Sequence, residues 1–177
     1  MAGSLIFRKA TQADVPAIAA IYDAVHSLEE QGLTTTGWQR AVYPTGTTAR
    51  ASVEAGDMFV AVRDGAIVAS ARINQEQVAE YTNAAWKHPA PDEQVMVLHT
   101  LAVDPAAKGQ GIGKAFVAYY EEYARAHGCP YLRMDTNARN TAARRLYGKL
   151  GYEEIGIVPC VFNGIEGVQL VCLEKKI

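Results

Sequence analysis

The stretch that decides the fold runs from Leu98 to Gly113 and reads LHTLAVDPAAKGQGIG. Its first part belongs to the run Val95–Val103, which is apolar on both alternating faces and predicts a central β-strand covered on both sides. Its last part sets glycines alternately between Lys108 and Lys114, directly before a helical pattern. Glycines let the backbone turn tightly, and a helix N-terminus offers unpaired N–H groups to an anion. The sequence therefore predicts a phosphate-binding turn between a buried strand and a helix.

Two common nucleotide-binding motifs do not fit the spacing of this turn. A Walker A loop has the form GxxxxGK[ST], but Lys108 occupies its first glycine position and Ala115 follows the lysine. The Rossmann fingerprint needs its third glycine at the position of Lys114. A nucleotide-dependent enzyme is therefore disfavoured. Two interpretations stay open: a cradle for another phosphate ligand, or a tight turn whose glycines only serve packing.

The remaining segments predict strands and helices around this centre. A hairpin is predicted where Asp64-Gly65 joins two β-prone runs, and Asn140 and Gly151 bound a helix. Residues 31–48 and 75–94 lack a period and are expected to be mostly loop. The expected strands cover 5–9, the two arms of 58–73, 95–103, 131–135, 153–158 and 167–174, and the expected helices follow Asp14, span 49–55, run from the glycine turn to Gly128, and follow Asn140.

These elements follow one another in the order βααβββαβαββ. That order predicts an α/β (α+β) fold class with a mixed central sheet of about six to seven strands, flanked by about four helices. The length of 177 residues fits a single domain over residues 1–177.

Composition and charge argue against several classes of protein. A hydrophobic content of 49% is too high for a disordered chain, and no apolar run is long enough to span a membrane. The first residues do not show a basic region followed by an apolar one, so no secretory signal is expected, and a net charge of −2 argues against a nucleic-acid partner. The three cysteines form no CxxC pair and the histidines show no metal-ligand spacing. We therefore expect free thiols, no metal, no membrane and a cytoplasmic location.

Two motifs, in the right order, resemble those of the GNAT superfamily of N-acetyltransferases. The pattern K-G-x-G-x-G after a V-D-P strand end, within Leu98–Gly113, is similar to the family's acyl-CoA pyrophosphate loop. Asp135–Tyr152 (DTNARNTAARRLYGKLGY) is similar to its second signature, in which an Asn opens a helix and A-x-x-L-Y-x-x-x-G-[FY] follows. The resemblance implies the GNAT fold and the transfer of an acetyl group from acetyl-CoA, the co-substrate, to a small-molecule amine or a peptide amine.

The resemblance also implies which residues hold the cofactor. In the family, the strand before the loop splays from its neighbour and pairs with the pantetheine arm, and the backbone N–H at Leu101 would face the thioester carbonyl. The loop would hold the pyrophosphate, and Asn140 would touch the cofactor, although a plain helix N-cap explains Asn140 equally well. The implied cofactor-binding residues are Leu101, Ala102, Val103, Lys108, Gly109, Gln110, Gly111, Ile112, Gly113, Lys114 and Asn140.

Tyr147 is the implied general acid. In the family, the Tyr at this place points at the thioester sulfur. A phenol with a pKa near 10 can protonate a departing thiolate, whose pKa is about 8.5 if it resembles cysteine. The alternative is a core aromatic in the apolar stripe of its helix.

His99 is the implied water-mediated base. It is expected on the same strand face as Leu101, and the segment H-T-L-A-V resembles the active-site strand of serotonin N-acetyltransferases, where a His helps to remove the amine proton through water. Many family members use a Glu near the position of Val97 instead. A core histidine without a catalytic role, a water chain, or Glu93 therefore stays open as an alternative.

The acceptor is not identified by the sequence. The family's acceptor wall suggests Trp38, Arg40, Tyr43, Tyr81 and Trp86 as substrate-pocket residues, with ordinary packing as the alternative for each. The late strands of the family often mediate dimers, which leaves a homodimer open.

We expect direct attack of the amine, without an acyl-enzyme. The reason is that no cysteine lies near His99 or Tyr147 in the sequence, and Cys129 follows the far end of the long helix. The competing hypothesis from another class is a non-catalytic acyl-CoA-binding sensor on the same fold.

Overall fold

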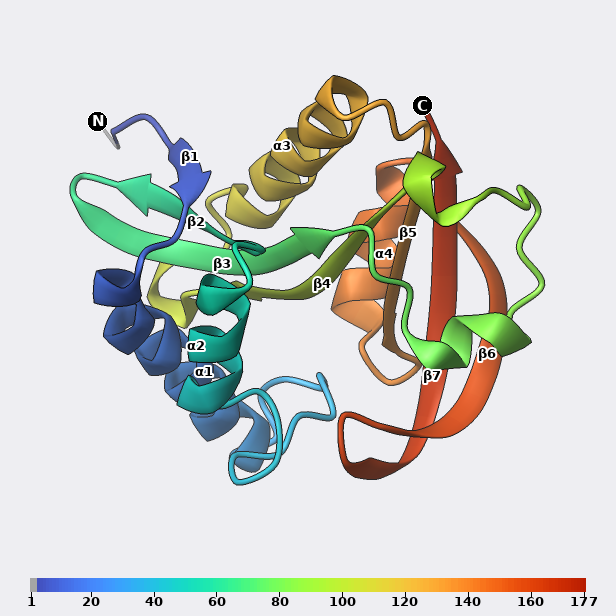
Figure 1. The fold of residues 1–177 in the computed structure, drawn as a ribbon. Helices are drawn as coiled ribbons and strands as arrows, with labels where there is room; N and C mark the ends of the chain where they lie inside the picture. The colour runs from blue at the N-terminus through green and yellow to red at the C-terminus, as the bar shows by residue number, and fades with distance from the viewer. Residues whose placement is uncertain (1–2) are drawn as a thin grey trace.

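Seven strands join one sheet in the spatial order β1-β2-β3-β4-β5-β7-β6 in the computed structural model, which describes residues 3–177 (Figure 1). β4 and β5 run parallel, and the other neighbouring strands pair antiparallel. The predicted fold class and element order are confirmed. The strands are β1 (Ile6–Lys9), β2 (Met58–Arg63), β3 (Ala66–Asn74), β4 (Val95–Val103), β5 (Tyr131–Asn137), β6 (Glu153–Phe162) and β7 (Ile165–Lys176).

Helices cover both faces of the sheet. On one face lie α1 (Val15–Glu30) and α2 (Gly46–Glu54), and on the other lie α3 (Ile112–Ala126) and α4 (Thr141–Lys149) (Figure 1). The helix predicted at 49–55 begins earlier, at Gly46, because the hydroxyl of Thr45 accepts a hydrogen bond from the backbone N–H of Thr48. The segment 75–94 is mostly loop, as predicted, with short 3₁₀ turns that include η2 (Ala79–Asn83).

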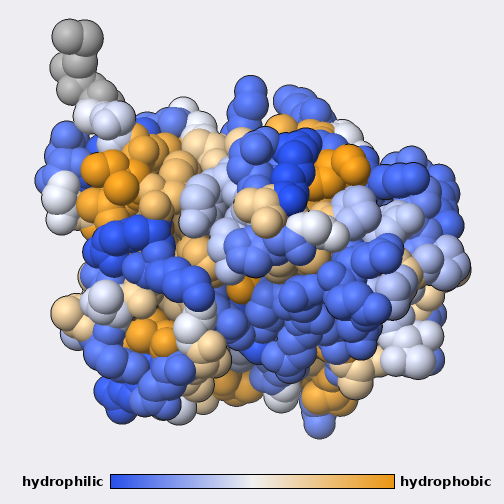
Figure 2. All heavy atoms as spheres, turned by 45° about the horizontal axis from the view of Figure 1, so that its top comes forward, coloured by the Kyte–Doolittle hydropathy of each residue, from blue (hydrophilic) through white to orange (hydrophobic). Residues whose placement is uncertain are grey.

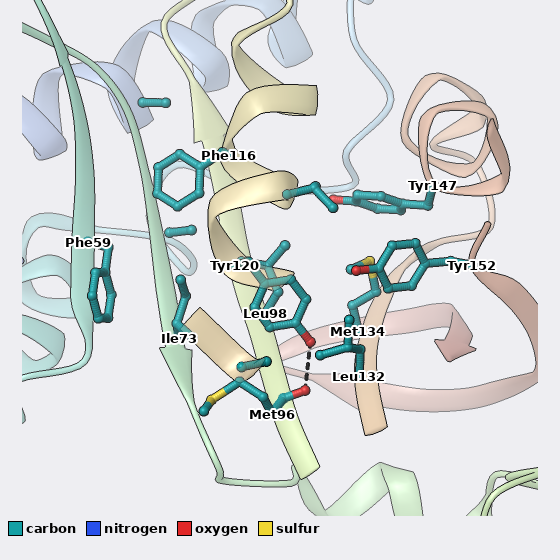
Figure 3. Packing of buried hydrophobic residues seen from close by; sticks show 14 of the residues in the cluster. Phe59, Ile73, Met96, Leu98, Phe116, Tyr120, Leu132, Met134, Tyr147 and Tyr152 are labelled. Carbon is teal, nitrogen blue, oxygen red and sulfur yellow. Dashed lines mark hydrogen bonds between the residues drawn. The ribbon is translucent and has the colours of Figure 1, made fainter. Parts of the chain in front are cut away.

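The largest hydrophobic core lies between the sheet and the pair α3 and α4 (Figure 3). Tyr120 of α3 is fully buried in it, and its hydroxyl donates a hydrogen bond to the carbonyl of Met96 at 2.6 Å (Figure 3). Met96 and Leu98 enter this core, while Val95 and Val97 enter another core on the opposite face of β4. The prediction of a central strand covered on both sides is therefore confirmed.

Two irregularities of β4 shape the centre of the molecule. Its pairing with β5 covers residues 95–98 and stops there, so the second half of β4 leaves its parallel neighbour. Toward β3, the register passes from Arg72↔His99 to Ser70↔Ala102, which leaves Thr100 and Leu101 opposite one residue. This β-bulge places Thr100 at φ +52°, a left-handed conformation that is uncommon for a β-branched residue.

The bulge corrects one prediction, that His99 and Leu101 share a strand face. One extra residue reverses the alternation of side chains beyond it. Leu101 therefore packs with Leu98 in the core beneath α3, whereas His99 lies on the same face as Val97. Periodicity read along the strand could not show this, because nothing in the apolar pattern marks the bulge.

The molecular face in Figure 2 is mostly hydrophilic, with hydrophobic residues gathered at the end of the sheet near β1. In the described part of the chain, no helix is long and apolar enough to cross a membrane. Nor do three or more His, Cys, Asp or Glu side chains within residues 3–177 come together as a metal site. The cysteines Cys129, Cys160 and Cys172 are free thiols.

Candidate active site

A cavity of about 460 Å³ opens where β4 leaves β5. One end is lined by the glycine-rich turn, the start of α3 and the start of α4. The other end is lined by α1, the segment that follows it, and the hairpin of β6 and β7. The two ends are joined by Leu98, by the residues from Thr100 to Val103 and by those from Asp135 to Asn137. One continuous space therefore connects the two motifs found in the sequence to segments that the sequence left unassigned.

The glycine-rich end is built from backbone. Gly109 and Gly111 take φ +80° and +73°, and a Cβ added at either would meet no atom within 4 Å. The requirement for glycine is therefore the left-handed backbone, not the space. Gly113 differs, because a Cβ added there would lie 3.4 Å from the side chain of Leu146 of α4, in close contact with the neighbouring helix. α3 begins directly after Gly111, so its first N–H groups lack helical partners beside the cavity.

The predicted cofactor-binding residues come together at this end, with one exception. The side chain of Gln110 does not line the cavity, and its carbonyl accepts a hydrogen bond from Arg63 Nη1 at 2.5 Å instead. Both lysines of the turn are exposed and sit at its two ends. The residues that line the cavity are Leu101, Ala102, Val103, Lys108, Gly109, Gly111, Ile112, Gly113, Lys114 and Asn140.

Asn140 caps a helix and also lies in the cavity wall, so its position fits both roles that the sequence left open. Its side chain accepts a hydrogen bond from the backbone N–H of Ala143 at 3.2 Å and so caps α4. It also lines the cavity. Arg144, which follows on the same helix, forms a bidentate pair with Glu154 at 2.7 and 2.8 Å. Its charge is thus already matched by an acid on β6.

Tyr147 reaches into the cavity from α4. Its ring is 7% exposed and extends from α4 toward α3 (Figure 3). Burial, and after it the negative charge of Asp135, raises the pKa of the Tyr147 hydroxyl. Tyr147 therefore keeps its proton at neutral pH.

His99 does not line this cavity. Its Nε2 lies 2.8 Å from the Oδ1 of Asn74 on the neighbouring strand. Burial is the main cause that lowers the pKa of His99 to about 3, and the charge of Arg72 lowers it further. The ring is therefore neutral at physiological pH. Its role as a base stays a prediction.

The five predicted acceptor residues divide into two groups. Trp38 and Tyr43 line the cavity, and the hydroxyl of Tyr43 is hydrogen-bonded to Thr100 in the bulge. Arg40, Tyr81 and Trp86 do not line it.

These three residues have other contacts. Arg40 is on the outer surface, where it pairs with Asp23 and Glu30. Tyr81 is buried behind the cavity wall, and its hydroxyl donates a hydrogen bond to Asp135 at 2.7 Å. The ring of Trp86 packs 5.0 Å from that of Tyr81.

Sequence reasoning missed Asp135 and the apolar wall opposite the glycine turn. Asp135 was expected to end a short strand and to open the second motif, with no role of its own, but β5 continues to Asn137 and Asp135 lines the cavity. A single acid at the end of an apolar strand, at the first position of the second motif, is the signal that could have marked it. The missed apolar residues of the wall are Val25, Leu28, Phe162, Ile165, Val168 and Leu170.

None of the cysteines lines the cavity in the described part of the chain. Cys172 pairs with Asp135 in the register of β5 and β7. Burial raises the pKa of the Cys172 thiol to about 12, with a smaller contribution from Asp135. Such a thiol stays protonated and is a poor nucleophile.

Comparison with protein families gives a match over residues 20–152 to a family described as the acetyltransferase (GNAT) family. A mycothiol acetyltransferase of Acidothermus cellulolyticus is 30% identical over 100 residues, which is 55% of this chain and 30% of that protein. An N-alpha-acetyltransferase RimI of Mycobacterium tuberculosis is 38% identical over 60 residues, 34% of this chain and 36% of that protein. The matches thus span about a third of the length of these two relatives.

Solved structures show the same fold over nearly the whole chain. A GNAT-family acetyltransferase from Streptococcus agalactiae superposes with a TM-score of 0.80 at 21% identity, covering 98% of this chain and 95% of that one. The acetyltransferase yncA from Salmonella typhimurium, described with its cofactor acetyl-CoA, superposes with a TM-score of 0.70 at 20% identity, over 98% and 94% of the chains.

Proposed function

This chain belongs to the acetyltransferase (GNAT) family, and from that premise we propose that it is an N-acetyltransferase that moves an acetyl group from acetyl-CoA to a primary amine. The observation that carries the proposal is that one continuous cavity joins the glycine-rich turn to a protonated tyrosine and to an apolar wall. The proposed catalytic domain spans residues 1–177.

The glycine-rich end fits the diphosphate of a coenzyme A thioester. Gly109 and Gly111 keep the backbone in a shape that no side chain crowds, and the N-terminus of α3 adds donors and a favourable dipole. Lys108 and Lys114 supply positive charge at both ends of the turn. The part of β4 that has left β5 offers backbone groups to an extended arm. Acetyl-CoA, when bound, supplies the activated acyl group as a thioester.

Tyr147 is the proposed general acid. It lines the cavity and keeps its proton at neutral pH, so it can donate that proton to the departing thiolate sulfur. The backbone N–H of Leu101 is proposed to stabilise the negative charge that develops on the carbonyl oxygen.

His99 is the proposed base, acting through water. Asn74 fixes the ring of His99 through one nitrogen, and the ring is neutral and free to take a proton, but a pKa lowered to about 3 makes it a weak base. Because His99 does not line the cavity, any proton transfer to it passes through water or neighbouring groups.

We propose direct attack by the amine. The bond from nitrogen to the acetyl carbon forms, the carbon–sulfur bond breaks, one amine proton passes to the base, and the thiolate takes the proton of Tyr147. The absence of a cysteine from the cavity wall within residues 3–177 supports direct transfer, as do the raised pKa values of Cys160 and Cys172.

The alternative is an acyl-CoA sensor without catalysis, which would keep the turn and need neither Tyr147 nor an acceptor end.

The experiment that separates the two incubates the protein and acetyl-CoA with a panel of primary amines. The panel includes aliphatic, aromatic and aminoglycoside amines, amino acids and peptide N-termini. Release of the CoA thiol and the mass of the acetylated amine are measured. Our proposal predicts matched thiol and product for at least one class. Tight acetyl-CoA binding with no product from any class would favour the sensor.

A further inference from the structure

Asp135 is a partly buried carboxylate that lines the cavity and has no part in the mechanism above. Its Oδ2 accepts a hydrogen bond from the hydroxyl of Tyr81 at 2.7 Å, which fixes the carboxylate from behind the cavity wall. Across the described residues 3–177, no Lys, Arg or His forms an ion pair with it. A carboxylate removed from bulk water without a basic partner leaves a negative charge facing the cavity.

The groups whose titration is coupled to Asp135 are themselves acids. Burial raises the pKa of Asp135 to about 6, so the carboxyl is mostly ionised near neutral pH. The acids that act on it or respond to it are Tyr43 from the segment after α1, Glu80 and Tyr81 from η2, Tyr147 from α4, Cys160 from β6 and Cys172 from β7.

A basic residue near this region is occupied elsewhere. Arg72 lines a second cavity of about 230 Å³, which shares Tyr43, Thr100 and Asn163 with the first. The guanidinium of Arg72 pairs with Glu76 and lies 3.7 Å from a carboxylate oxygen of Asp57. Its charge is thus matched by acids of its own, and the charge of Asp135 is left for a ligand.

The rest of this end of the cavity has an apolar and aromatic wall beside the polar groups of Thr34, Thr36 and Asn163. A ligand that reaches Asp135 therefore meets aromatic and aliphatic side chains around its other atoms. The residues concerned are Val25, Leu28, Trp38, Phe162, Ile165, Val168 and Leu170.

We propose that Asp135 is the residue that recognises the acceptor, by binding the ammonium group of a primary amine that is carried on an apolar or aromatic group. This inference rests on the proposed function, whose substrate class it narrows. The negative charge of Asp135 also reaches Tyr147, so a bound ammonium would offset that charge and lower the pKa of the tyrosine toward that of the leaving thiolate. The ammonium proton that must leave before attack passes to water, and from there to bulk solvent or to the base proposed above.

The test compares two ligands of nearly the same shape, benzylamine and benzyl alcohol, because only the first carries a positive charge. Each is titrated near neutral pH into the CoA complex of the wild-type protein and of Asp135→Asn, which keeps an oxygen for Tyr81. Glu122→Gln, on the exposed face of α3, is the matched control for losing a carboxylate. We expect wild type and control to bind the amine at least about tenfold more tightly than the alcohol, and Asp135→Asn to lose the preference.

The proposal is overturned if wild type does not bind the amine, if it binds both ligands equally, or if Asp135→Asn keeps the preference. Acetyl-CoA titrated into each variant shows whether the fold and the coenzyme end are intact. Failure of all variants to bind acetyl-CoA would count against the proposed function instead. The amine preference can then still be measured without the coenzyme.

Discussion

The two ends of the cavity are built in different ways. The coenzyme end is centred on backbone from one short stretch, where Gly109 and Gly111 hold left-handed conformations and α3 begins, with the start of α4 beside it. The acceptor end consists of side chains from segments far apart in the sequence, among them Leu28, Asp135 and Phe162. A backbone site can serve any chain that binds the same coenzyme. A side-chain site can change with the acceptor while the fold stays the same, and this contrast guides the predictions below.

Tyr147→Phe tests the point where the two ends meet, and we expect the largest effect there. Removing the hydroxyl deletes a proton donor but keeps the ring that packs against the core. The kcat should fall by about 10²–10⁴-fold, while the Kd for acetyl-CoA stays nearly the same. Steady-state kinetics and calorimetry on one preparation check both values. An unchanged kcat would remove Tyr147 as the acid.

His99→Gln tests whether the base lies outside the cavity wall. The amide keeps a hydrogen-bonding group for Asn74, and kcat should fall by about 10²-fold with coenzyme binding unchanged. Because the pKa of His99 is lowered to about 3, the ring should not titrate between pH 5 and 8. A pH–rate profile of the wild type checks this. If the variant kept full activity, His99 would not be the base, and Glu93 or a water chain would take its place in the account.

Asp135→Asn should change the free energy of unfolding by an amount that depends on pH. The comparison with the wild type tests how much the ionised carboxylate of Asp135 destabilises the folded protein. The pKa of this carboxyl is about 6 in the folded protein, above the ordinary value of about 3.9, so ionisation opposes folding. The wild type should lose stability relative to the variant as pH rises from about 4 to about 6. The difference above pH 6 should reach about 2–3 kcal/mol.

Denaturant unfolding of both proteins at several pH values measures this difference. Glu122→Gln serves as the exposed control and should show no such trend. A constant difference between Asp135→Asn and wild type across the pH range would contradict the picture of a buried acid without a basic partner.

Gln110→Ala should have the smallest effect, although this residue lies within the glycine-rich turn. Its side chain binds Arg63 and does not line the cavity, whereas alanine keeps the backbone N–H. We expect the Kd for acetyl-CoA to change by less than about twofold. A tenfold loss, measured by calorimetry, would show that the turn binds through side chains after all.

The same contrast explains what the sequence could predict. The element order, the central strand and the glycine-rich end of the cavity follow from local patterns, since a glycine turn between a buried strand and a helix is visible in one stretch. Asn140 was recognised for the same reason, as a residue that opens a helix.

The acceptor end depends on contacts that no local pattern encodes. Trp38 and Tyr43 line the cavity, but Arg40, between them in the sequence, pairs with acids on the outside. The bulge at Thr100 places His99 and Leu101 on opposite faces of β4. The residue types in this part of the strand do not indicate that a bulge forms there. Such features arise from how distant segments pack, so the structure was needed to find them.

The central claim, that the turn binds the coenzyme through its backbone, is tested most directly by calorimetric titration of acetyl-CoA into Gly111→Asp and Gly128→Asp. The two glycines share a left-handed φ and open surroundings at opposite ends of α3, so the backbone strain of each substitution is matched. We predict that Gly111→Asp weakens binding by about 100-fold, through charge repulsion and a blocked approach, while Gly128→Asp binds like the wild type. Equal affinity of the two variants would contradict the account.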